Sequence, residues 1–538
     1  MYIYRRYLDE DKGDKCAVRH TRRPWNDREE IEETKEEWNV FKEQWKKNRI
    51  NFERMSVFVG DDESKINFSW YSRDQYTPMI RISKNKDMSD AQIFEGKSEI
   101  QIEKMEATKE NNNNDNIDDL EDEDDNEEVI DGDTKYKIDK KFKIARKKYY
   151  TNRVTVKNIE RNSIYYYQRY YRGKWESAIK YKTYDDKNFK FIFVGDPQIG
   201  GGHGRYKDFP KYRSKTTDDD GNRNDAFNWN RVIERAFEFA ENPSVLLSAG
   251  DQADDMGGYG GVANQESQYS AFLYPKKLKQ IVMATSVGNH EALTNGFGRH
   301  FYTPNPLKDS SYIKKSGLSY KGMDWYTGYN YFFKYNNVLV VVLETNQNTE
   351  SDYNKIVRNA IMKYPETDWR IALFHHDIFG AGFSHSQSDA RDIRGTIFNV
   401  LSKYAFDLVI NGHDHVYTST KFVSYADNNK DVNSPNNYNV DDKVKTNEVI
   451  ENPKGTFFIT ANCSSGSKYM YFHNDASLYD NYIYQKAQTN TTSFGLLDFT
   501  QNNGKARLTI NTYDVESYEV IDGAFIFEKD IGSNVDKV

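Results

Sequence analysis

Short polar motifs with the residue types of metal ligands follow five apolar segments of this 538-residue chain. In chain order the motifs contain Asp196 with Gln198, Asp251 with Asp254, Asn289 with His290, His375 with His376, and His413 with His415. Carboxylate and amide oxygens mixed with imidazoles suit iron, manganese or zinc, and the lack of thiolates argues against a structural zinc. More than four ligands exceed what one catalytic ion takes from a protein. The set therefore favours two ions, about 3.5–4 Å apart.

The segments that carry these motifs indicate how they come together. Residues 191–194, 245–249, 281–287, 371–374 and 408–410 are apolar without alternation, which is typical of strands buried on both faces. Helical patterns at 229–240 and 388–403 are interleaved with them, so the sequence predicts an α/β architecture. In such sheets ligands gather outside the carboxyl ends of the strands. One motif alone is more often a turn or a hydrogen-bonded core histidine; all five together predict one site.

The motif series resembles that of the calcineurin-type metallophosphoesterases and, within them, the purple acid phosphatases. The matching stretches are Gly-Asp-Pro-Gln, Gly-Asp-Gln-Ala-Asp, Gly-Asn-His-Glu, Ala-Leu-Phe-His and Gly-His-Asp-His, between residues 191 and 415. The resemblance implies an α/β four-layer fold, with two mixed β-sheets flanked by helices, preceded by a β-sandwich. It also implies two metal ions, iron paired with zinc, manganese or a second iron. One would be held by Asp196, Asp251 and His415, and the other by Asn289, His375, His413 and the bridging Asp251.

The same resemblance assigns roles to two further histidines, and a third lies beside a ligand. His290, directly after an asparagine ligand, would hydrogen-bond the phosphate. His385, ten residues after His375, stands where the family places an acid that protonates the leaving group. His376 lies beside a ligand, and we interpret it as support for that ligand.

The chain departs from the purple enzymes at one position. Their metal-binding tyrosine, three residues after the bridging aspartate, is replaced here by Asp254. Either Asp254 binds the metal directly or Gln198 provides the missing ligand, since related phosphoesterases have a ligand two residues after the first aspartate. Tyr259, in a glycine-rich stretch, is a less favoured third choice. We therefore expect no tyrosinate charge-transfer band, and the identity of the metals stays open.

Changes in pattern along the chain predict three parts. Residues 1–51 form a charged helical extension, in which Trp38, Phe41 and Trp45 lie three and four apart and would pack against the body of the protein. Residues 52–186 alternate like the strands of a fibronectin type III-like β-sandwich, interrupted by an acidic, disordered insertion at 108–134. Residues 187–538 form the catalytic domain.

Composition excludes several classes of protein. The 75 Lys and Arg against 83 Asp and Glu give a net charge of −8, which offers no electrostatic reason to expect a nucleic-acid partner. Two cysteines, Cys16 and Cys463, are too few for a disulfide framework. No run approaches the ~20 apolar residues of a membrane span. No signal peptide is visible, although members of the family are often secreted; compartment and oligomeric state stay open.

These features predict an enzyme that hydrolyses phosphate monoesters, with a hydroxide bound to the dinuclear metal centre and a small phosphorylated molecule as substrate. A phosphodiesterase or nucleotidase using the same site is one alternative. A non-catalytic adhesion protein that retains the fold is another, and the sandwich and the acidic insertion favour it. The complete ligand set argues against it.

Overall fold

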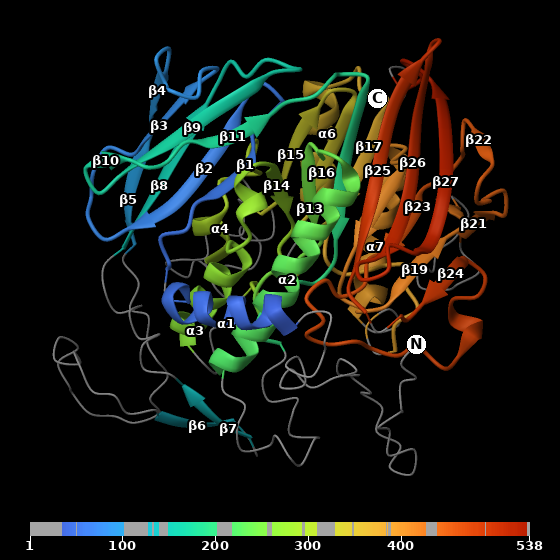
Figure 1. The fold of residues 1–538 in the computed structure, drawn as a ribbon. Coiled ribbons are helices and arrows are strands. Elements are labelled where there is room, and N and C mark those ends of the chain that lie inside the picture. Colours follow the sequence, from blue (N-terminus) through green and yellow to red (C-terminus); the bar gives the residue numbers. More distant parts are fainter. Residues whose placement is uncertain are drawn as a thin grey trace.

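Two large β-sheets form the centre of the protein (Figure 1). The computed structural model describes residues 35–49, 51–101, 127–131, 134–138, 149–201, 218–254, 261–292, 296–308, 329–346, 349–383, 385, 389–426, 438–489 and 491–534. The first sheet has eleven strands in the order β22 (Val449–Glu451), β27 (Val520–Asp530), β26 (Lys505–Asp514), β25 (Ser493–Asn502), β12 (Asn188–Val194), β13 (Val245–Ser248), β14 (Val282–Thr285), β1 (Ser56–Val59), β2 (Ile66–Ser72), β8 (Tyr149–Val156) and β5 (Lys97–Gln101). The second has seven, in the order β15 (Tyr331–Tyr335), β16 (Val338–Val342), β17 (Trp369–Leu373), β18 (Leu408–Asn411), β23 (Phe457–Thr460), β19 (Tyr417–Thr420) and β24 (Ile483–Ala487).

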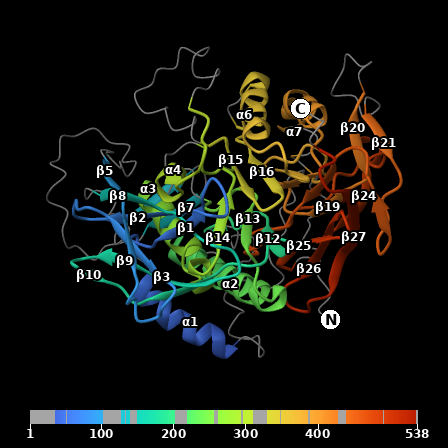
Figure 2. The same ribbon diagram turned by 90° about the horizontal axis from the view of Figure 1, so that it is seen from above.

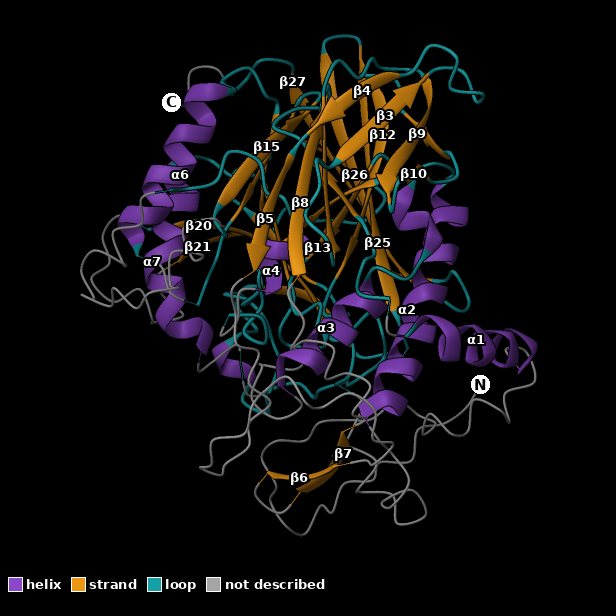
Figure 3. Ribbon diagram, turned by 90° about the vertical axis from the view of Figure 1, so that its left-hand side faces the viewer, coloured by secondary structure: helices purple, strands orange, loops and turns teal. Residues whose placement is uncertain are grey.

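Helices cover the outer faces of these sheets. Figures 2 and 3 show α6 (Glu350–Lys363) and α7 (Asp389–Lys403) on one side of the strands and α2 (Asp218–Ala240) on the other, with α1 (Lys35–Asn48) beside α2. The remaining elements include α3 (Gly261–Phe272), α4 (Gly296–His300), the 3₁₀ helices η6 (Lys276–Lys279) and η8 (Ala476–Leu478), and a ribbon of β20 (Phe422–Tyr425) and β21 (Tyr438–Asp441). The predicted four-layer α/β fold with mixed sheets is confirmed.

Strand β16 illustrates why the central strands read as unbroken apolar runs. Val340 and Val342 belong to the hydrophobic core that both sheets share, whereas Leu339 and Val341 belong to a second core that includes side chains of α6 and α7. Successive side chains of a strand point to opposite faces, and here each face is covered. Strands β16, β17, β18 and β23 are parallel neighbours, as are β12, β13 and β14, so their carboxyl ends share an edge within each sheet.

The predicted β-rich region before the catalytic domain is present. Its strands β10 (Lys174–Trp175), β9 (Ile164–Tyr171), β3 (Met79–Ser83) and β4 (Gln92–Glu95), with β11 (Ile179–Lys182) paired to β9, form a separate five-stranded sheet. Strands β1, β2, β8 and β5 instead continue the eleven-stranded sheet, because β1 pairs in parallel with β14, where Phe58 is opposite Met283. The two regions are thus joined by backbone hydrogen bonds, which the sequence did not predict.

The acidic insertion predicted at 108–134 lies mostly outside the described residues. Within it, β6 (Glu127–Asp131) pairs antiparallel with β7 (Thr134–Ile138), and the disorder of the insertion stays a prediction. The two strands are only two residues apart in sequence, and such a short separation favours a local hairpin.

Helix α1 packs through the aromatic side chains expected to do so. Trp38, Phe41 and Trp45 are buried, and the rings of Trp38 and Phe41 lie 5.1 and 5.3 Å from Phe227 of α2. The stripe is therefore a packing surface. Within the described part of the chain, no helix combines the length and the hydropathy needed to cross a membrane.

Candidate metal centre

The predicted ligands meet between the two large sheets, at the carboxyl ends of their strands. Asp196, Asp251 and Asn289 follow β12, β13 and β14 of the eleven-stranded sheet, whereas His375 and the pair His413 and His415 follow β17 and β18 of the other. The nitrogen Nε2 of His375 lies 3.3 Å from Asp251 Oδ2 and 2.9 Å from Asn289 Oδ1. Contacts between the sheets thus run through these side chains.

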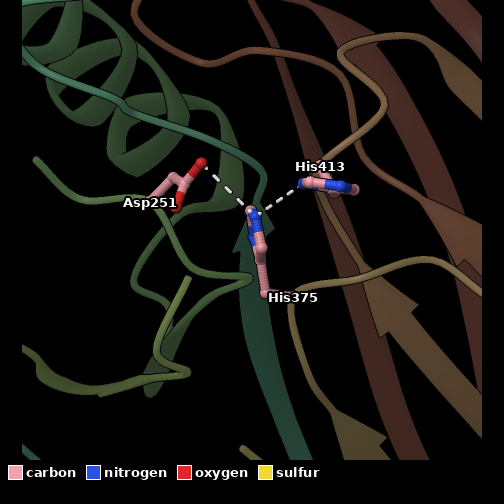
Figure 4. A group of neighbouring side chains, drawn as sticks. All are labelled: Asp251, His375 and His413. Atoms are coloured by element: carbon pink, nitrogen blue, oxygen red, sulfur yellow. Dashed lines mark hydrogen bonds and ion pairs between the residues drawn. The ribbon is translucent and has the colours of Figure 1, made fainter. Parts of the chain in front are cut away.

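Three of the residues form a compact group of ligand atoms. Atoms of Asp251, His375 and His413 all lie within 4.8 Å of one another, and all three side chains are buried (Figure 4). Figure 4 shows His375 between the other two, and its Nε2 is 3.0 Å from Nδ1 of His413. Because Nδ1 of His375 donates to the carbonyl oxygen of Ala249 at 2.9 Å, Nε2 is the atom presented to an ion.

Asp196 and His415 stand beside this group. Oδ1 of Asp196 lies 3.6 Å from Nε2 of His415 and 3.7 Å from Nδ1 of His375. Both carboxylate oxygens of Asp196 accept from the backbone amide of His413, each at 2.9 Å. His415 donates from Nδ1 to the carbonyl of Lys468 at 3.0 Å, which turns Nε2 toward Asp196. All six residues predicted as ligands therefore meet in one place.

The backbone of the motifs turns through an unusual conformation. Asp196, Gln198, Asp251, His413 and His415 have φ values of 34°, 32°, 47°, 73° and 50°. This left-handed region costs a residue other than glycine about 1–3 kcal/mol, and such strain persists where the surrounding structure enforces it, commonly at functional sites. The sharp turns bring the side chains back over the strand ends from which they come.

Three motif glycines make room for ligands from other strands. A Cβ on Gly288 would lie 1.8 Å from Oδ1 of Asp251, and one on Gly412 would lie 2.4 Å from Oδ2 of Asp196. At Gly250, with φ of 96°, it would lie 2.5 Å from Nδ1 of His375. The main effect of these glycines is to leave space for a neighbouring side chain.

The buried charges strongly influence one another. Burial raises the pKa of Asp196 to about 7, with His375 partly opposing the rise. Burial alone would also raise the pKa of Asp251, but the neighbouring His375 and His290 hold it below its usual value. Burial lowers the pKa of His375, yet the carboxylates of Asp251 and Asp196 outweigh it and raise that pKa to about 9. Cations would replace these protons readily, since ligands bind metals in their deprotonated form.

Gln198 supplies a direct test of whether the residues fit an ion. Its Nε2 lies 2.7 Å from Oδ1 of Asp254 and 2.9 Å from Nε2 of His290, so the two amide hydrogens are engaged. Its Oε1 is buried and has no hydrogen-bond partner among the residues that the structure describes. An unpaired buried oxygen is unfavourable, and a cation would satisfy it. The donor set therefore fits a metal centre. Tyr259, the third choice for this role, lies outside the described residues.

The three further histidines lie around this centre. His290 contacts the carbonyl oxygen of Asp254 through Nδ1, and its Nε2 is 3.9 Å from Oδ2 of Asp251. His385 stacks on His413 with ring centroids 3.8 Å apart, and its Nδ1 donates to the carbonyl of His413 at 3.0 Å. His376 is buried, and its Nδ1 is 2.7 Å from the hydroxyl of Thr345.

Two residues at the site had no role in the sequence interpretation. Glu291 accepts from the backbone amides of Gly288 and Ala253, both at 2.8 Å, and so ties two motif loops together. Burial and the charge of Asp251 raise its pKa to about 8. Its position in Gly-Asn-His-Glu was a usable signal. Lys468, eight residues beyond β23, follows a loop of small residues and gave no such signal.

Comparison with known proteins agrees with this arrangement. Residues 189–417 match the family model "Calcineurin-like phosphoesterase", so this part of the chain is a domain of that family. Among solved structures, the purple acid phosphatase PPD1 from yellow lupin (Lupinus luteus) seeds aligns over 88% of this chain and 74% of its own, with a TM-score of 0.55 and 13% identity. At that identity the likeness shows a common fold. The protein is therefore a hydrolase of the metallophosphoesterase type, a class that implies a dinuclear metal centre.

The other comparisons add nothing to this assignment. A glycosyl hydrolase family 2 member from Bacteroides cellulosilyticus aligns over 67% of this chain and 37% of its own, at 7% identity and a TM-score of only 0.16. No curated protein matches the chain significantly.

Proposed function

We propose that this protein hydrolyses phosphate monoesters at a dinuclear metal centre. The observation that carries the proposal is the meeting of six oxygen and nitrogen donors from two sheets, linked by contacts such as the 3.3 Å between His375 and Asp251. One ion would be held by Asp196, Asp251 and His415, and the other by Asn289, His375, His413 and the shared Asp251. A bound metal pair supplies charge neutralisation and a water whose pKa is lowered from 15.7 to about 7.

The histidines around the centre would handle the substrate. Nδ1 of His385 donates to the carbonyl of His413, so proton transfer to a leaving oxygen would occur at Nε2. Nε2 of His290 accepts from Gln198 in this arrangement, so donating to a phosphate oxygen requires that this nitrogen carry a proton. His376 would keep the orientation of its neighbour His375 through its contact with Thr345.

Of the two choices for the position of the family tyrosine that lie within the described residues, Asp254 and Gln198, the contacts favour Gln198. Asp254 receives the amide of Gln198, and this bond orients Oε1 of Gln198 as a ligand atom. We propose that Gln198 completes the first metal site and that Asp254 positions it. The ions would be iron paired with zinc, manganese or a second iron. Because no tyrosinate would bind them, the metal-loaded protein would not be purple.

The metal-loaded protein is expected to show no tyrosinate charge-transfer band. The substitution Gln198→Ala is expected to weaken binding of one ion by roughly 10- to 100-fold, which is the range for loss of a residue that tunes a metal site. Titration calorimetry and metal analysis measure the affinities, and absorption spectroscopy measures the band. Gln485→Ala, at an exposed position in β24, serves as the matched control. A purple preparation, or unchanged binding of both ions by Gln198→Ala, would contradict the assignment.

His385→Asn is expected to slow hydrolysis by about 10²–10⁴-fold for esters with poor leaving groups, because these need a proton from a general acid. Esters of p-nitrophenol leave readily as anions and should lose much less. Rates for alkyl and p-nitrophenyl phosphates, measured side by side, test this. An equal loss for both substrates would remove His385 from the role of acid.

Two alternatives are decided by the same preparation. Activity on bis-(p-nitrophenyl) phosphate that exceeds activity on the monoester would assign the protein to the diesterases, and a strong preference for nucleoside monophosphates would assign it to the nucleotidases. A protein that binds no metal and hydrolyses neither ester would instead be a non-catalytic relative of the fold. The boundaries 1–51, 52–186 and 187–538 are also proposals, and limited proteolysis tests them.

A further inference from the structure

The chain segment that leads to His385 is fixed to its neighbours by backbone hydrogen bonds. Two bonds of 2.8 Å, one of them from the amide of Phe383 to the carbonyl of Tyr471, join residues 381–383 to residues 471–473. A side chain held on such a segment has little freedom to move toward or away from a substrate. The position of His385 is therefore set by the structure around it.

Asp414 lies where this segment turns. It stands between His413 and His415, is fully buried, and accepts from the amide of Gly382 through Oδ2 at 2.6 Å. A Cβ on Gly382 would lie 2.2 Å from Cγ of Asp414, and one on Gly380 would lie 2.6 Å from Oδ2. The segment thus closes tightly around the carboxylate, and glycine permits the approach.

The other carboxylate oxygen of Asp414 faces His385. Oδ1 lies 3.8 Å from Nδ1 of His385, which is too long for a hydrogen bond and short enough for a direct Coulomb interaction. The same Nδ1 donates to the carbonyl of His413 at 3.0 Å, and the ring stacks on His413. Since 20% of the His385 side chain is exposed, Nε2 is the nitrogen left to meet a ligand.

Stacking alone does not decide which way the imidazole of His385 is turned. A rotation of the ring by half a turn keeps the stacking on His413 and exchanges Nδ1 for a carbon atom. A negative charge 3.8 Å away favours the orientation in which a nitrogen that carries a hydrogen lies beside it. Asp414 therefore favours the orientation in which Nε2 is directed away from the segment.

We propose that Asp414 is a positioning residue for hydrolysis: it orients His385 so that Nε2 faces the leaving oxygen of the substrate. Asp414 acts through His385 and does not touch the substrate itself. This inference rests on the proposed function and on the role of His385 within it. The alternative is that Asp414 only holds the segment in place through its bond to Gly382.

The substitution Asp414→Asn separates these two roles in the metal-loaded full chain. Asparagine keeps the shape of the side chain and an oxygen that can accept from Gly382. Its amide NH₂ then takes the place of Oδ1 and opposes the Nδ1 hydrogen of His385, because both groups are donors. Hydrolysis of an alkyl phosphate should slow by about 10- to 100-fold, the cost of a misplaced catalytic group, and that of p-nitrophenyl phosphate by less than about threefold. A purely structural role predicts equal changes for both esters.

A double-mutant cycle tests whether Asp414 acts through His385. In a His385→Asn background, Asp414→Asn should change the rate for the alkyl phosphate by less than about twofold, because residues that act through one another are not additive. Asp522→Asn is the matched control. Asp522 is also buried, lies in β27 and accepts from the hydroxyl of Ser419 at 2.6 Å, so its substitution should leave the ratio of the two rates unchanged.

Equal losses for both esters in Asp414→Asn at full metal content, or losses that multiply in the double variant, would overturn the inference. Should the variant fail to fold or to hold metal, a crystal structure of the metal-loaded wild type with orthovanadate decides the question. Nε2 of His385 within hydrogen-bond distance of a vanadate oxygen, with Nδ1 beside Asp414, supports the proposal, and a ring turned the other way overturns it. Failure of the proposed function is distinct, because the wild-type chain would then hydrolyse neither ester.

Discussion

Asp251→Asn is expected to lower the rate of p-nitrophenyl phosphate hydrolysis by at least about a thousandfold, the upper range for removal of one electrostatic group from an active site. Asparagine keeps the shape of the side chain and removes its charge. Oδ2 of Asp251 lies 3.3 Å from His375, and Oδ1 accepts from the amide of His290 at 3.1 Å, so this carboxylate stands between the two groups of ligands. Without its charge, neither ion would be held firmly, and metal analysis should show less than a full complement.

The matched control is Asp498→Asn. Asp498 is half-buried in β25 and lies opposite Lys190, at the end of β12 away from the motifs. It should keep wild-type turnover and metal content. Wild-type rates in Asp251→Asn at full metal occupancy would show that this carboxylate does not bridge the ions and would remove the basis of the ligand assignment.

Gly288→Ala is expected to lower activity by about 100-fold or more, since a displacement of 1 Å in an active site can cost that much. The added methyl carbon would stand 1.8 Å from Oδ1 and 2.4 Å from the backbone nitrogen of Asp251. One of these groups must move, because the methyl carbon cannot overlap them. Overpacking of this kind also destabilises the fold by about 1–3 kcal/mol, which thermal unfolding of the metal-free protein measures.

Gly298→Ala provides the comparison. A methyl group there would approach the side chain of Tyr329 most closely, at 3.3 Å, and should leave activity and metal binding close to wild type. If Gly288→Ala were equally harmless, the close approach of Gly288 and Asp251 would have to be absent from the protein in solution.

The elements that carry the site were predictable from the sequence because they are buried on both faces. Residues 191–194 and 408–410 are apolar throughout, and 245–249 contains a single polar residue, Ser248; the three runs correspond to β12, β18 and β13 within a few residues. Their ligands follow at once, so the pattern also located Asp196, Asp251 and His413. A run of this kind depends only on local sequence and on the presence of a core.

Other features depend on neighbours that are distant in sequence, and no local pattern encodes them. The pairing of β1 with β14 depends on an edge of the catalytic sheet that is completed only by later residues. The bond from Gln198 to Asp254 depends on two turns that meet after both strands have formed. Lys468 reaches the centre because its loop folds back over the first motif. Only tertiary packing shows these relations.

The continuity between the N-terminal strands and the central sheet also bears on how the catalytic half could exist alone. In the whole protein, β1 satisfies the outer backbone groups of β14, and β2 then covers β1. In a chain beginning at residue 187, β14 would be an exposed edge strand with unpaired amides and carbonyls. Exposed edge strands pair with strands of other molecules, which leads to aggregation. The preceding region therefore protects the edge of the catalytic sheet from pairing with other molecules.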